Sequence, residues 1–306
     1  MLTQVMTAME VLDDPTTNGE KVCNLFKDYD GVHAEYETIK TKRGKTDVVR
    51  ITIYGSDSSA PVLGIIGQLG GVGARPQMIG LVSDADGAIA AIACALKLAQ
   101  MKRKGEETTG TIFVTTHICP NAPTKEHKPV PFMDSPIGVE EVLKSMLNRD
   151  VDAILSIDTT KGNRVIKKRG FAISPTVLRG YILKVSEDLL DIYERVCGTA
   201  PFVLPITTQD ITPYDNGVYH INSIMQPCTV VPHVPVVGVA ITTEVPVAGC
   251  ATGASHEVDI ELAARFCVEV AKYFGKGQVK FYDKAEFEKL VEMYGDLTHL
   301  VTTRMI

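Results

Sequence analysis

The hydrophobic pattern of the chain has two periods, which separate the expected strands from the expected helices. Short apolar runs of about four to eight residues are typical of buried strands, whereas apolar residues three or four positions apart indicate helices. Residues 47–54 alternate most clearly, since Val49, Ile51 and Ile53 would share one face of a strand. The expected strands cover residues 32–39, 47–54, 62–66, 111–115, 153–157, 202–206 and 236–242. The expected helices lie within residues 1–27 and at 88–104, 139–147, 183–197, 257–274 and 284–294. Because strands alternate with helices, the pattern predicts an α/β fold with a mixed, mostly parallel, doubly wound sheet and helices on both faces.

A glycine-dense turn separates an apolar strand from an acidic helix entrance between residues 64 and 88. Its glycines, at positions 67, 70, 71 and 73, would let the backbone turn sharply or approach a bound group, because glycine has no Cβ to forbid positive φ. Together with Arg75 they could cradle a phosphate. The nucleotide-binding fingerprint, however, needs glycines that open a helix directly after the strand, and here Pro76 and a second apolar run intervene. A tight turn is therefore the favoured interpretation.

Polar residues follow three of the expected strands, after positions 66, 115 and 157. The carboxyl ends of parallel strands form the edge at which open α/β sheets bind ligands, so we expect function there. Residues 117–136 are rich in proline and are expected to form a long irregular loop, and loops of that length are often functional. His117 and Cys119 are two positions apart and would share a strand face, although an inert cysteine is the more common case.

Composition narrows the class of protein and of partner. With 306 residues and 45% hydrophobic content, the chain can bury a large core as one large α/β domain or two modest ones. Lys and Arg total 31 against 37 Asp and Glu, which gives a formal charge of -6. The sequence contains no cluster of basic residues of the kind that binds nucleic acid. The seven cysteines show no Cys-x-x-Cys spacing, and no segment approaches the roughly 18 apolar residues of a membrane span. We therefore expect a cytoplasmic protein whose partner is a small molecule or a second copy of itself, with no nucleic acid and no membrane.

Two carboxylates and one imidazole stand at junctions between expected strands and helices. They are Asp84, Asp158 and His256, and these ligand types suit zinc, manganese or cobalt. A simpler interpretation is that Asp84 caps a helix, Asp158 is a loop acid and His256 begins a helix. The spacing alone leaves both interpretations open. A serine hydrolase has no visible nucleophile, because no Gly-x-Ser-x-Gly elbow precedes a helix.

Several segments together resemble the co-catalytic zinc aminopeptidases of the glutamyl and tetrahedral aminopeptidase kind, and more distantly carboxypeptidase-like amidohydrolases of the same fold. The matching segments are VLGIIGQLGGVG (62–73), SDADGA (83–88), GTIFVTTHICPNA (110–122), AILSIDTT (153–160) and GASHEVDIELAARF (253–266). The resemblance covers nearly the whole chain. It implies a single domain over residues 1–306 that lacks the domain usually inserted before the bridging ligand. The sequence as a whole also resembles an uncharacterised prokaryotic family, the domain of unknown function 1177.

This resemblance assigns metal-ligand roles to three residues. At two other positions of the family's metal site, this chain has residues of a different kind. Asp84 matches the bridging carboxylate, Asp158 a terminal carboxylate and His256 the last imidazole ligand. Gln68 stands in the place of the first histidine ligand, and Gly70 in the place of the aspartate that orients that histidine. The resemblance therefore implies a degenerate or rearranged metal site.

The usual pair of glutamates, one a general base and one a ligand, is also replaced, by Pro120 and Asn121. Three ligands and a water are enough for a catalytic zinc, so the expected cofactor is one divalent ion, with zinc first and manganese or cobalt as alternatives. The candidates for a substitute base are Asp86, Glu257 and His117. The residues expected to contact substrate are Gln68, Asn121, Asp210 and His220.

Three functions follow from these residues. The first is a metal-dependent hydrolase, which the resemblance implies, cleaving an amide or related bond in a small amino-acid-like substrate. The alternative is a catalytically inactive protein of the same fold that binds a small molecule. A third interpretation is a metal-free acid–base enzyme that uses the polar segment 207–223 with His117. The resembled fold also implies a homo-oligomer.

Overall fold

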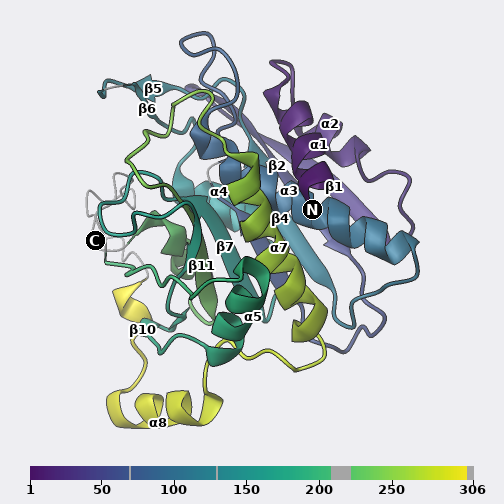
Figure 1. Ribbon diagram of the computed structural model, residues 1–306, viewed down its shortest axis with the longest axis vertical. Helices are drawn as coiled ribbons and strands as arrows, with labels where there is room; N and C mark the ends of the chain where they lie inside the picture. The colour runs from purple at the N-terminus through teal and green to yellow at the C-terminus, as the bar shows by residue number, and fades with distance from the viewer. Residues whose placement is uncertain (69, 129, 208–221, 302–306) are drawn as a thin grey trace.

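The computed structural model describes residues 1–68, 70–128, 130–207 and 222–301 (Figure 1). The helices are α1 (Leu2–Asp13), α2 (Gly19–Asn24), α3 (Asp86–Arg103), α4 (Val139–Met146), α5 (Glu187–Cys197), α6 (Pro227–Val230), α7 (Glu257–Phe274) and α8 (Lys284–Tyr294), with 3-10 turns η1 (Ser83–Ala85), η2 (Ser223–Met225) and η3 (Thr298–Leu300). The strands are β1 (Val32–Thr41), β2 (Gly44–Ile53), β3 (Leu63–Gly67), β4 (Ile112–Ile118), β5 (Thr124–Lys125), β6 (Phe132–Met133), β7 (Ala153–Thr159), β8 (Gly170–Ile173), β9 (Val177–Leu178), β10 (Tyr181–Ile182) and β11 (Val236–Thr242).

A nine-stranded sheet has the order β1-β2-β4-β3-β7-β11-β9-β10, with β8 also paired to β11. Its central strands β4, β3, β7 and β11 are parallel, whereas β1 and β2 form an antiparallel hairpin and β2 joins β4 antiparallel. Parallel neighbours need long crossovers, which the helices supply. The predicted α/β class with a mixed sheet is confirmed. The carboxyl ends of the central strands meet along one edge, and the candidate site lies there.

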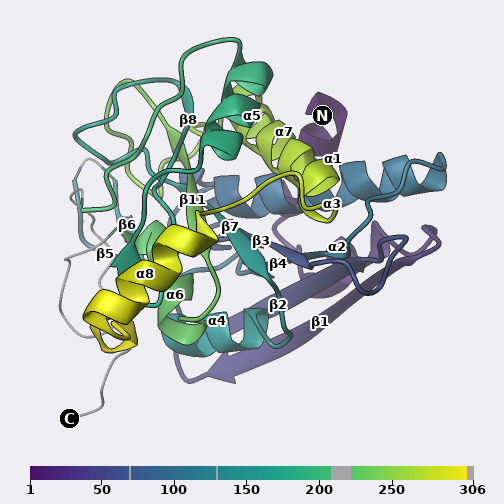
Figure 2. The same ribbon diagram turned by 90° about the horizontal axis from the view of Figure 1, so that it is seen from below.

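Helices cover both faces of this sheet, as seen from below in Figure 2. One face carries α1, α3, α5 and α7, while α4 and α6 lie on the other. Successive side chains of a strand point to opposite faces, so Ile65 packs in the cluster under α3 and Ile66 in the cluster beside α4. Strands that are buried on both faces have continuous apolar sequences, which explains why these strands are predicted well.

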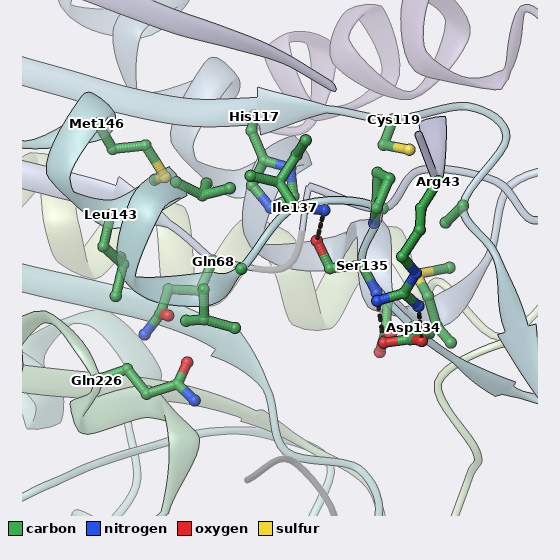
Figure 3. A pocket seen from close by; sticks show the side chains of 18 of the residues that line it. Arg43, Gln68, His117, Cys119, Asp134, Ser135, Ile137, Leu143, Met146 and Gln226 are labelled. Carbon is green, nitrogen blue, oxygen red and sulfur yellow. Dashed lines mark hydrogen bonds and ion pairs between the residues drawn. The ribbon is translucent and has the colours of Figure 1, made fainter. Parts of the chain in front are cut away.

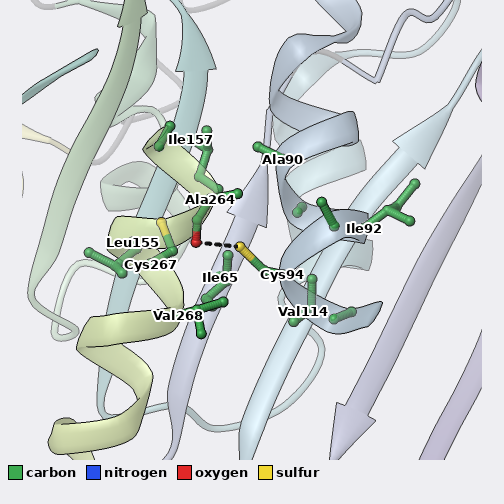
Figure 4. Close-up of a cluster of buried hydrophobic side chains, with 14 of the residues drawn as sticks. Ile65, Ala90, Ile92, Cys94, Val114, Leu155, Ile157, Ala264, Cys267 and Val268 are labelled. Carbon is green, nitrogen blue, oxygen red and sulfur yellow. Dashed lines mark hydrogen bonds between the residues drawn. The ribbon is translucent and has the colours of Figure 1, made fainter. Parts of the chain in front are cut away.

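Helix α3 is the centre of the larger core, because small side chains let it approach both the sheet and α7. Figure 4 shows Cys94 of α3 beside Cys267 of α7, where the Cys94 thiol donates to the Ala264 carbonyl at 3.4 Å. Burial raises the pKa of the Cys267 thiol well above its usual value. Both buried cysteines therefore act as small apolar residues of the core.

Three expectations about the elements are wrong. The segment expected as an irregular loop up to residue 136 is partly ordered, because β4 continues to Ile118 and β5 pairs with β6. Residues 202–206 form no strand, because Val203 makes only an isolated bridge with Ile173. The helix expected at 183–197 begins only at Glu187, because the Ser186 hydroxyl accepts a hydrogen bond from Leu189 N and caps it there. Within the part of the chain that the structure describes, no helix is both long and apolar enough to span a bilayer.

Candidate functional site

A cavity of about 160 Å³ opens at the carboxyl edge of β3 and β4 (Figure 3). The polar residues that line it away from its charged mouth are Gln68, Asp84, His117 and Gln226. One wall is apolar and comes mostly from α4 and the segment before it: Phe132, Ile137, Val139, Val142, Leu143 and Met146. A few polar groups set in an apolar lining are the usual composition of a small-molecule site.

Charged side chains occupy the exposed end of this cavity. The Asp134 carboxylate pairs with Arg43 Nη2 and lies 3.3 Å from Lys125 Nζ. The side chains of Arg43 and Lys125 are 58% and 62% exposed, so they mark the mouth. Gln68 and Asp84, by contrast, are 4% and 6% exposed and mark the closed end.

The glycine-dense segment after β3 forms an extended ribbon beside the end of β4. Gly70 N donates to His117 Nε2 at 3.0 Å, and Val72 N donates to the Cys119 carbonyl at 3.0 Å. A Cβ at Gly70 would lie 1.5 Å from the His117 carbonyl oxygen, so only glycine fits there. These amide groups are used within the fold, which argues against a phosphate cradle, and the segment runs extended beside β4 where the sequence favoured a tight turn.

His117 is held in one neutral tautomer. Because Gly70 N–H donates to Nε2, the ring proton lies on Nδ1, which donates to Thr46 Oγ1 at 2.9 Å. The Thr46 hydroxyl then donates to the Ile118 carbonyl at 3.3 Å. Burial lowers the pKa of His117 to about 4. With both ring nitrogens engaged, His117 is poorly placed to act as the predicted base or to complete a metal site.

Gln68 is fixed by the donors of its own amide. Its two Nε2 protons are donated to Ser156 Oγ at 2.7 Å and to the Ile224 carbonyl at 3.0 Å, with the Ser223 carbonyl sharing one of them at 3.3 Å. The side chain thus ties β3 to β7 and η2 at the closed end of the cavity. A histidine ligand could not make this set of bonds, because a ring nitrogen carries at most one proton.

Asp84 lines the cavity from η1, and the segment 248–251 holds that turn in place. Asp84 N donates to the Gly249 carbonyl at 3.1 Å, and Ser83 Oγ to the Ala248 carbonyl at 2.8 Å. A Cβ at Gly249 would lie 2.4 Å from the Asp84 carboxylate, so a larger residue there would displace that side chain. The carboxylate therefore lies close against the Gly249 backbone.

The other two predicted metal ligands have partners of their own. Asp158, at the end of β7, accepts a bond from Ser223 Oγ at 3.3 Å. His256 precedes α7, and its Nδ1 lies 3.4 Å from Asp259 Oδ2. Over the described residues, no group of three or more His, Cys, Asp or Glu side chains is arranged to hold a metal ion. The donor set of this part of the chain thus does not fit a metal by itself, and the ligand assignment stays a prediction.

The remaining predicted residues lie in different surroundings. Asp86 is completely buried in an ion pair with Lys161; burial raises its pKa, and the Lys161 charge opposes that shift. Glu257 is exposed in the first turn of α7, where a negative charge favours the helix dipole. Asn121 is exposed and bridges Ala74, outside the cavity lining. Asp210 and His220 lie outside the described residues.

Cys119 does line the cavity together with His117, as their spacing predicts. Burial raises the pKa of its thiol to about 11, and Sγ lies 3.5 Å from the Lys45 carbonyl. It is therefore a protonated thiol and not an activated nucleophile.

Sequence reasoning missed the charges at the mouth. Arg43, Lys125 and Asp134 come from a hairpin turn and from both sides of the small β5-β6 hairpin. The only signal was the proline-rich loop that contains two of them, whose length is typical of functional loops.

The fold and the position of the cavity define the class, an α/β protein with an aminopeptidase-like fold. A point mutant of tomato leucine aminopeptidase is similar in structure, with a TM-score of 0.51 and 9% sequence identity. The match covers 87% of this chain and 61% of that one, so the chain spans less than two thirds of the aminopeptidase, and at this identity the likeness shows the fold alone. The chain belongs to the family described as protein of unknown function (DUF1177), which it matches over residues 37–304. No curated protein sequence matches the chain.

Proposed function

We propose that this protein binds a small amino-acid-like molecule in the cavity between the sheet edge and α4. The distribution of charge along the cavity carries the proposal. The buried end carries the Asp84 carboxylate, and the exposed end carries Arg43 and Lys125 together with Asp134, the one carboxylate that pairs with both of them. A ligand with an ammonium group and an apolar body would complement the closed end and the α4 wall.

The size of the cavity supports a ligand of this class. Its volume of about 160 Å³ is below the roughly 300–1,000 Å³ of pockets for drug-sized ligands. The polar groups at the closed end are held by the bonds of Gln68 and by the contact between Asp84 and Gly249, so the site is largely formed before a ligand enters. A preformed site loses less free energy to ordering on binding.

Isothermal titration calorimetry with L-leucine, L-methionine and 4-methylpentanoate tests this function. The last compound keeps the apolar chain and the carboxylate of leucine but has no amine. We expect both amino acids to bind, the amine-free acid to bind more weakly, and Asp84→Asn to weaken leucine binding about ten- to a hundredfold. Asp150→Asn removes the same charge from an exposed position and should leave binding unchanged. Equal binding of leucine and 4-methylpentanoate would contradict the proposal.

Hydrolysis of an amide bond in such a molecule is the second candidate, favoured by the aminopeptidase-like fold and by the sheet-edge positions of Asp84 and Asp158. We propose one divalent ion, zinc before manganese or cobalt, as its cofactor, with His256 as a further ligand. Since the described residues do not assemble this site, we assign no step to the ion.

Release of leucine from leucine amide and from leucyl dipeptides, measured with each metal and with a chelator, tests the hydrolase. We expect turnover that the chelator, Asp158→Asn and His256→Gln each abolish, with metal content falling in both variants. If leucine binds but no metal supports turnover, the hydrolase is excluded and the binding function stands. A cytoplasmic, homo-oligomeric protein is part of the same proposal, and sedimentation velocity of the purified chain tests its assembly.

A further inference from the structure

We propose that Arg43 and Lys125 at the cavity mouth select ligands that carry a free carboxylate, so that the occupant is a free amino acid or a short peptide with a free carboxyl end. The inference rests on the proposed function and refines its ligand class. Arg43 and Lys125 are the residues that determine this specificity. Amides and esters of the same compounds are the ligands that they disfavour.

The first observation is that one carboxylate faces two cations. Arg43 lies in the turn between β1 and β2, Lys125 lies in β5, and Asp134 directly follows β6. Asp134 pairs with both cations, and Figure 3 shows its contact with Arg43 at one end of the cavity. Among the described residues of the mouth, these three side chains carry two positive charges and one negative charge, and a second carboxylate would neutralise the excess.

The second observation is that the anion is fixed while the cations are not. Asp134 N donates to the Pro123 carbonyl at 2.8 Å, and Asp134 Oδ1 accepts a bond from Ser135 N at 2.9 Å. The side chain of Asp134 is 17% exposed, whereas those of Arg43 and Lys125 are more than half exposed. The two long side chains can thus turn toward a ligand without disturbing the backbone.

The third observation is that both cations keep donors for a second acceptor. A guanidinium has five N–H donors and an ammonium three, and Asp134 uses only part of them. A ligand carboxylate at the mouth could therefore be bound by Arg43 and Lys125 together while Asp134 keeps its contacts. Charge-assisted bonds to a carboxylate are stronger than neutral ones, and a primary amide lacks that charge.

The two ends of the cavity then fix the orientation of the ligand. In a free amino acid both charged groups are bonded to one Cα, so the ammonium group would be directed toward Asp84 and the carboxylate toward the mouth, with the side chain along the wall formed by Val142, Leu143 and Met146. A peptide bond after the first residue would still place a free carboxylate outward. Converting that carboxylate to an amide or ester would remove its attraction to Arg43 and Lys125 and leave the contacts at the closed end unchanged.

The test compares the Kd of L-leucine with that of L-leucinamide by calorimetry at pH 7 and low salt. We expect the wild-type protein to prefer the acid about three- to tenfold, a range set by partly exposed charge pairs. In the double variant Arg43→Gln with Lys125→Gln the ratio should approach one, through a loss of leucine affinity with the affinity for leucinamide unchanged. Asp134→Asn removes the competing anion and should increase the preference for the acid.

Arg164→Gln is the matched control, because Arg164 is an exposed arginine outside the cavity lining and its loss should leave the ratio unchanged. Equal affinity of the wild-type protein for acid and amide would overturn this inference while leaving the proposed function in place. So would a ratio that the double variant does not change. Failure of both compounds to bind would remove the proposed function and this inference together.

Discussion

Asp86 and Lys161 form an ion pair in which neither side chain reaches solvent, with side-chain exposures of 0% and 1%. Asp86 opens α3, Lys161 follows β7, and the Lys161 ammonium also donates to the Ala254 carbonyl ahead of α7. The pair therefore joins three segments that are far apart in sequence. A buried charge is tolerated in a protein only when it is paired and bonded, so each partner depends on the other.

Removing one member of this pair should be more harmful than removing both. Asp86→Asn or Lys161→Met leaves a buried charge without its partner, and each should lower the free energy of unfolding by about 3–5 kcal/mol. The double variant should lose clearly less than the sum of the two, as urea denaturation at pH 7 can show. Additive losses in this cycle would mean that the two charges do not depend on each other.

His117 should make the protein less stable in mild acid. Its pKa is about 4 in the folded chain, below the value of about 6.5 expected in the unfolded chain. The unfolded chain therefore takes up a proton that the folded chain refuses. The contribution of His117 to stability is complete above about pH 6.5 and decreases as the pH falls toward 4, by up to roughly 3 kcal/mol.

Denaturant unfolding at several pH values between 4 and 7 would measure this contribution. His117→Gln should flatten that part of the stability curve by up to the same roughly 3 kcal/mol. His127→Gln removes an exposed histidine whose Nδ1 lies 3.2 Å from the Val130 carbonyl and whose ring lies beside Phe132, and its curve should follow the wild type. An unchanged slope in His117→Gln would show that His117 is not held neutral.

The sequence predicts the fold well where a pattern is long and locally complete. The structure gives α7 the predicted bounds of 257–274, because an amphipathic period of that length leaves few alternatives. The short strands β8, β9 and β10 were missed, and residues 202–206 were predicted as a strand in their place. An apolar run predicts burial, whereas pairing at a sheet edge depends on which neighbours the rest of the chain brings there.

The candidate site was predictable in position and less so in chemistry. Gln68, Asp84 and His117 follow or precede strands in the sequence, and the structure places all of them in one cavity. Their hydrogen bonds could not be foreseen, because the partners of Gln68 lie on β7 and η2, far along the chain. The contact between Arg43 and Asp134 could not be predicted either, because it joins two hairpins and no repeating pattern in the sequence connects them.

Gly70 should be intolerant of any side chain. Because a Cβ there would lie 1.5 Å from the His117 carbonyl oxygen, Gly70→Ala must displace the backbone of β4 or the turn itself. We expect a loss of about 1–3 kcal/mol or more in the free energy of unfolding, together with weaker ligand binding, because the His117 bond to Gly70 N would break. Gly162→Ala is the control, since nothing lies within 4 Å of a Cβ at that position. Similar stabilities of the two variants would mean that the turn is not packed as described.

Replacing Gln68 should lower the free energy of unfolding. The loss should depend on pH when the replacement titrates, and not when it is apolar. Gln68→Glu directs an acceptor at the Ile224 and Ser223 carbonyls, so the folded state should favour the protonated acid, which still has one O–H donor. The pKa of that glutamate would then be raised by folding, and the stability that its proton provides would be lost as the pH increases from 5 to 8.

Gln68→Met fills a similar volume with no donor and no titrating group, so its loss of about 1–3 kcal/mol should be the same at both pH values. Denaturant unfolding of the two variants at pH 5 and pH 8 separates these effects. If Gln68→Glu were as stable as the wild type at pH 8, the amide would have to be turned the other way, with its oxygen rather than its nitrogen facing Ile224 and Ser223. The residue in the place of the first histidine ligand would then direct its amide donors to the cavity, and ligand binding in Gln68→Met would fall more than stability.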